Sequence, residues 1–116
     1  MNISITGKDF ELTDSLENFV KEKANKLSKY DPRINRVQVI LSVDDGHHKK
    51  GQIHMAEIII DRPGKDIVVK ESGDEMHAAI DIAMEKAKKA IEKQKGDKIS
   101  RGKYREIIKG ILTRRK

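Results

Sequence analysis

Two segments of the chain, residues 2–7 and 37–44, alternate hydrophobic and polar residues with the period of two that is typical of β-strands. Residues 52–62, which are rich in isoleucine, and residues 66–71 predict two further strands. The last two are separated by Pro63-Gly64, a pair that favours a tight turn. Residues 44–51 between the second and third segments are polar and predict a loop.

Two other segments repeat their apolar residues every three or four positions, which predicts amphipathic helices. The first begins at Thr13, a good N-cap, and should end near Lys29 because Asp31-Pro32 disfavours helical geometry. The second follows Asp74 and should end near residues 95–96. The predicted buried faces are Leu16, Phe19, Val20, Ala24 and Leu27, and Met76, Ala79, Ile80, Ala83, Met84, Ala87 and Ile91.

The predicted order of elements is β-α-β-β-β-α, which places the chain in the α+β class. A single domain at residues 1–96 would form a four-stranded sheet with both amphipathic helices on one face. The remaining residues, 97–116, would form a basic tail. With 116 residues, the chain has room for one domain and hardly for two.

The net charge of +6 is unevenly distributed. Residues 1–83 carry 12 Lys/Arg and 15 Asp/Glu, whereas residues 84–116 carry 13 Lys/Arg and 4 Asp/Glu. Such a basic C-terminal third indicates a polyanionic partner, although a solvated basic helix and tail would give the same pattern. Without cysteine, a signal peptide or a long apolar run, we expect a soluble, cytoplasmic protein that does not enter a membrane.

On a helical wheel the lysines of both helices border the buried stripes. Lysines so placed can bury their stems and hold their ammonium groups in an array that meets RNA phosphates. The acids of the second helix, Asp81, Glu85 and Glu92, gather on its outward back. The predicted RNA-binding residues are Lys23, Lys26, Lys86, Lys89 and Lys93, with Lys88, Lys95, Lys98 and Arg101 as additional contacts.

Other chemistry finds little support in the sequence. Aromatic residues form only 3% of the chain, so stacking platforms for single strands are scarce and recognition of folded RNA by shape and phosphate fits better. The four histidines, His47, His48, His54 and His77, lack the spacing of a metal site. No catalytic arrangement or phosphate loop is visible, and we expect no metal, cofactor or enzymatic activity.

Residues 2–7 (NISITG), the capped helix from Thr13 to Tyr30 and residues 74–81 (DEMHAAID) resemble the ribosome hibernation-promoting factor / ribosome-associated inhibitor (protein Y) family. The resemblance covers about residues 1–98. It implies a factor that lodges in the decoding channel of the small ribosomal subunit, contacts 16S-type rRNA and excludes mRNA and tRNA during stationary phase or stress. The family's basic positions fall on Lys23, Lys26, Lys86, Lys89 and Lys93.

The chain departs from this family in two places. His77 replaces the usual tyrosine of the second helix, and the tail is basic. A complete short form and the N-terminal part of a longer protein both remain open. Two rival functions remain as well: a double-stranded RNA-binding module, which would lack the first strand, and an assembly factor that does not act on RNA.

The tail contains an apolar stripe at helical spacing over residues 103–112. A helix there would be marginal alone and would form only when docked, either on a second copy or along rRNA. Self-association through this helix and a disordered basic tail are the two alternatives.

Overall fold

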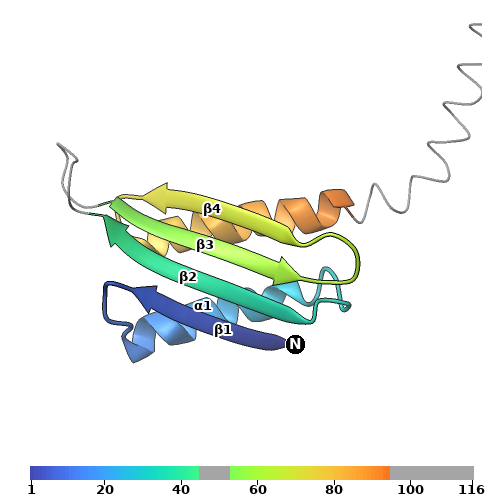
Figure 1. Ribbon diagram of the computed structural model, residues 1–116, viewed down its shortest axis with the longest axis horizontal. Coiled ribbons are helices and arrows are strands. Elements are labelled where there is room, and N and C mark those ends of the chain that lie inside the picture. The colour runs from blue at the N-terminus through green and yellow to red at the C-terminus, as the bar shows by residue number, and fades with distance from the viewer. Residues whose placement is uncertain (45–52, 95–116) are drawn as a thin grey trace, which may run out of the picture.

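The computed structural model describes residues 1–44 and 53–94. The elements, in chain order, are β1 (Asn2–Lys8), α1 (Asp14–Leu27), β2 (Arg36–Asp44), β3 (Ile53–Asp61) and β4 (Ile67–Gly73). A second helix follows β4 and is described over residues 76–94. The predicted β-α-β-β-β-α order is therefore confirmed (Figure 1).

The sheet has four strands in the order β1-β2-β3-β4. β1 pairs with β2 in parallel, and the other two pairs are antiparallel. Because parallel neighbours need a crossover, α1 crosses between β1 and β2 on one face of the sheet. The second helix returns after β4 to the same face, as Figure 1 shows. Both helices thus form a single layer, as predicted, and β1 is the strand that a double-stranded RNA-binding module would lack.

The core lies between the sheet and this helical layer. On β2 and β3 the buried side chains alternate with partly exposed ones, and the buried ones face each other across the two strands. Each helix contributes the apolar stripe that its spacing predicted. Residues with no exposed surface include Val20, Val37, Val39, Leu41, Ile58, Ile60, Ile80 and Ile91.

The first helix begins as its sequence predicts and ends slightly earlier. The Thr13 hydroxyl accepts a hydrogen bond from the Leu16 amide at 3.1 Å, which satisfies one of the free amides of the first turn. The helix ends at Leu27 instead of Lys29, because the amides of residues 28–30 bond to carbonyls three residues back and tighten the last turn.

The second helix begins at residue 76, so that Glu75 takes the capping position that was predicted for Asp74. The Glu75 carbonyl accepts the Ala79 amide at 3.1 Å. Gly73 lets the end of β4 lie close to the first turn of this helix, since a Cβ at residue 73 would lie only 3.0 Å from the Ala79 nitrogen. Neither described helix combines the length and hydropathy needed to cross a membrane.

A buried ion pair ties the helical layer to the sheet. Asp31 follows α1 and Arg62 follows β3, and their side chains are only 2% and 3% exposed. The Arg62 Nε lies 3.4 Å from an Asp31 carboxylate oxygen, and another Arg62 nitrogen donates to the Gln94 side-chain carbonyl at 2.8 Å. Arg33 also donates to Asp31 through Nε at 3.0 Å. These contacts connect Gln94 of the second helix with the loop that follows α1.

Candidate nucleic-acid interface

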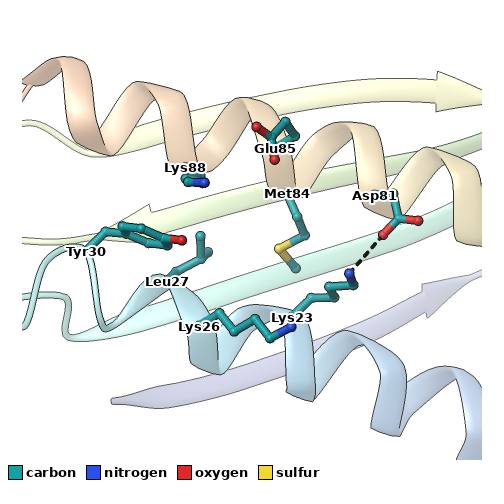
Figure 2. A pocket seen from close by; sticks show the side chains of 8 residues that line it. All are labelled: Lys23, Lys26, Leu27, Tyr30, Asp81, Met84, Glu85 and Lys88. Atoms are coloured by element: carbon teal, nitrogen blue, oxygen red, sulfur yellow. Dashed lines mark ion pairs between the residues drawn. The ribbon is translucent and has the colours of Figure 1, made fainter.

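A groove runs between α1 and the second helix on the outer side of the helical layer. Its volume is about 320 Å³. Figure 2 shows that the two helices supply its walls and that charged side chains surround an apolar floor. The lining residues are Lys23, Lys26, Leu27, Tyr30, Asp81, Met84, Glu85 and Lys88.

The α1 side of the groove holds two of the predicted lysines, Lys23 and Lys26. Helical spacing places Lys23 one turn after Phe19, and its ammonium lies 5.5 Å from the centre of that ring. The same ammonium forms an ion pair with Asp81 of the second helix, at 3.4 Å. The Lys23 side chain is one-third exposed, so its charge is oriented by two neighbours yet remains accessible.

The opposite wall holds Lys88 in a similar arrangement. Its ammonium lies 5.2 Å from the centre of the Tyr30 ring. A hydrogen bond to the Tyr30 hydroxyl raises the pKa of Lys88 above its ordinary value. The negative charges of Glu85 and Glu92 raise this pKa further. Lys88 is therefore a cation at neutral pH. We call Lys23, Lys26 and Lys88 the groove lysines.

The other three predicted lysines of the second helix lie on its opposite flank. Lys86, Lys89 and Lys93 are exposed, and none of them lines the groove. Lys86 forms an ion pair with Glu71, which places this flank on the β4 side of the helix. We call these three residues the flank lysines. The structure thus separates the five predicted RNA-binding lysines into two sets with the second helix between them.

Two acids of the second helix, Asp81 and Glu85, line the groove. Both are exposed, as the helical wheel predicted for the outward side of this helix. The sequence already places Asp81, Glu85 and Lys88 on one helical stripe, at i, i+4 and i+7. The helical wheel of one helix cannot show that α1 lies beside this stripe and completes a groove.

His77 packs at the start of the same wall. Its ring lies 4.7 Å from that of Phe19, with an angle of 59° between the planes. The residue that departs from the family pattern therefore makes an aromatic contact with α1. The Phe19 ring also contacts the ammonium of Lys23, which lines the groove. His77 therefore supports the ring that orients a groove residue.

Several predicted residues lie outside the described part of the chain. They are Lys95, Lys98, Arg101, His47, His48 and the tail at 97–116 with its predicted helix. Within residues 1–44 and 53–94, no group of three or more His, Cys, Asp or Glu side chains is placed to hold a metal ion.

The chain is similar in sequence to proteins of known name. The chain is 34% identical over 95 residues to the ribosome hibernation promoting factor of Escherichia coli K12, covering 82% of this chain and 94% of that one. It is 30% identical over 102 residues to the factor of the same name from Azotobacter vinelandii, with 87% and 89% covered.

Solved structures show the same architecture. The N-terminal domain of Thermus thermophilus Protein Y superposes with a TM-score of 0.70 and 29% identity, over 80% of this chain and 98% of that domain. A ribosomal subunit interface protein from Coxiella burnetii gives a TM-score of 0.71 at 20% identity, with 83% and 99% covered, and so shares the fold.

The class is thus that of ribosome hibernation factors. The Sigma 54 modulation protein / S30EA ribosomal protein family matches residues 3–99, and the chain belongs to this family. The predicted resemblance is confirmed.

Proposed function

We propose that this protein binds the small ribosomal subunit at its decoding channel, through phosphates of 16S-type rRNA, and silences translation by excluding mRNA and tRNA. The observation that carries the proposal is the helical layer, which presents lysines on both sides of the second helix. The relatives named as ribosome hibernation promoting factors support a ribosomal partner. A ribosomal partner places the site of action in the cytoplasm.

The two lysine sets suit a folded, phosphate-rich surface. An α-helix is about 10–12 Å across with its side chains, so cations on its two flanks can reach phosphates of different backbone segments. Phosphate contacts fix position and orientation and read little sequence. The protein would then act by occupying space, and no chemical step on rRNA or nucleotide is needed.

Co-sedimentation with purified ribosomal subunits over a range of salt concentrations tests this proposal. With about five lysines of the two sets on phosphates, the logarithm of the association constant should fall with the logarithm of salt concentration at a slope of about −4. Binding should be selective for the small subunit and should be lost when mRNA and initiator tRNA are added first. A shallow salt dependence would contradict phosphate binding and favour an assembly factor that docks through apolar surface.

A further inference from the structure

We propose that the groove between α1 and the second helix receives one unpaired nucleobase of the bound RNA and recognises it by an exocyclic amino group. This inference rests on the proposed function and deepens it. Phosphate binding explains lysines, but it explains neither the apolar floor of the groove nor its two carboxylates. A base has both an apolar face and a polar edge, and the groove offers a partner to each.

The floor of the groove suits the face of a base. Leu27 and Met84 are buried, with 2% and 6% of their surfaces exposed, and they form the bottom of the groove between the helices. Tyr30 supplies an aromatic ring in the wall (Figure 2). Aromatic and apolar side chains are the usual neighbours of RNA bases that have left their stacks. The volume of about 320 Å³ is at the small end of ligand pockets, which suits one nucleotide and excludes a duplex.

The carboxylates argue against a phosphate inside the groove. Asp81 and Glu85 would repel it, and Lys23, the cation nearest to Asp81, is already paired with that carboxylate. One Asp81 oxygen contacts Lys23, and the side chain remains 54% exposed, so acceptor capacity is left over. Glu85 is exposed on the next turn of the same stripe. Carboxylates accept hydrogen bonds from amino groups of bases, as they do from cytosine N4.

Lys26 and Lys88 then hold the phosphates on either side of the inserted base. Both line the groove from opposite helices, and Lys88 is oriented by Tyr30. Cytosine, adenine and guanine all carry an amino group on the edge that would meet Asp81 and Glu85. Uracil has no amino group there, and its single N3–H donor lies between two carbonyl oxygens that the carboxylates would repel. The groove therefore favours an unpaired cytosine, adenine or guanine over uracil.

The sign of one substitution separates base recognition from simple charge attraction. Replacing Glu85 with glutamine removes a negative charge from a surface that binds a polyanion, so charge alone predicts tighter binding to the small subunit. Glutamine keeps one acceptor oxygen but loses the negative charge that strengthens the hydrogen bond, so base recognition predicts weaker binding, by up to about tenfold. Glu92→Gln is the matched control, because Glu92 lies on the same helix, is exposed and does not line the groove. It should leave affinity unchanged or raise it slightly.

Chemical probing of the rRNA gives a second readout. Dimethyl sulfate reports adenine N1 and cytosine N3, and kethoxal reports guanine. Wild-type protein should protect one unpaired base that becomes reactive again with Glu85→Gln or Asp81→Asn, while protection of the other positions persists. Both variants alter exposed side chains, and unchanged melting temperatures will show that they fold.

The outcomes separate this inference from the proposed function. If wild-type protein does not bind the small subunit, the proposed function is wrong and the base inference fails with it. If wild-type protein binds as proposed, but Glu85→Gln binds equally well or tighter and no base regains reactivity, the base inference alone is overturned.

Discussion

Replacing Lys86, Lys89 and Lys93 together with glutamate is expected to abolish co-sedimentation with the small ribosomal subunit. Each exposed charge contact contributes up to about 1 kcal/mol, and reversal adds repulsion, so affinity should fall about a hundredfold or more. The slope of the salt dependence should also become less steep by about three, since three phosphate contacts are lost. The measurement is sedimentation at low and physiological salt.

A matched control separates position from net charge. Lys8, Lys65 and Lys70 are exposed and lie on the sheet or its loops, away from the helical layer. Changing all three to glutamate alters the net charge by the same amount and should reduce affinity far less. Equal losses in the two triple variants would show that the second helix has no special part in binding.

The flank lysines differ in one respect that affects this experiment. Lys86 forms an ion pair with Glu71, so Lys86→Glu places two carboxylates side by side. The double variant Lys89→Glu with Lys93→Glu avoids that repulsion and should still weaken binding strongly. Binding that survives in both the double and the triple variant, with melting temperatures unchanged, would exclude this flank as the RNA surface.

The largest expected effect on stability comes from Asp31→Ala. It leaves the Arg62 guanidinium, 3% exposed, without its buried carboxylate partner. Removal of one member of a buried ion pair is expected to lower the free energy of unfolding by about 3–5 kcal/mol. Asp31→Asn keeps a hydrogen-bond acceptor and should lose less. Urea unfolding monitored by circular dichroism measures both losses.

The exposed turn residue Asp66 provides the control, since Asp66→Ala removes an equal charge and should change stability by less than about 0.5 kcal/mol. A loss below about 1 kcal/mol for Asp31→Ala would mean that water or a rearranged Arg62 replaces the pair. Arg62→Met is expected to be milder than Asp31→Ala, because Asp31 then keeps its hydrogen bonds from Arg33.

The Asp31 carboxylate also makes the stability of the fold depend on pH. Hydrogen bonds from the Arg33 side chain lower the pKa of Asp31 below its ordinary value near 3.8, and burial opposes this only in part. A lowered folded-state pKa stabilises the fold at pH values above the ordinary pKa, and this contribution disappears as the pH falls through the folded-state pKa. The difference in stability between wild type and Asp31→Asn should therefore be constant near neutrality and shrink in strong acid.

Local patterns predicted the elements because side-chain periodicity reports directly which face of a strand or helix is buried. Val37, Val39 and Leu41 alternate in the sequence and are all buried on β2. Errors at helix ends were small, as at Leu27, where a tightened last turn ends α1 two residues early. The class of fold followed from these elements alone.

Contacts between distant elements were not predictable in the same way. Asp31 and Arg62 are 31 positions apart, and no periodic pattern connects them. The groove likewise depends on how α1 packs beside the second helix, which the wheel of either helix cannot show. The lysines could therefore be identified from the sequence, whereas the structure was needed to show that Lys23, Lys26 and Lys88 share one groove. The structure also showed that Asp81 and Glu85 line this groove.

The attachment of the second helix at its first turn and at Gln94 has a consequence for how quickly this protein would leave its target. Gly73 brings the end of β4 against the first turn of the helix, and Arg62 contacts Gln94 in the last described turn. Lys23 and Lys88 are in addition oriented by aromatic rings before any ligand arrives. Less conformational entropy is then lost when RNA binds. Such preorganisation favours a long residence time, which is what a factor that keeps ribosomes idle requires.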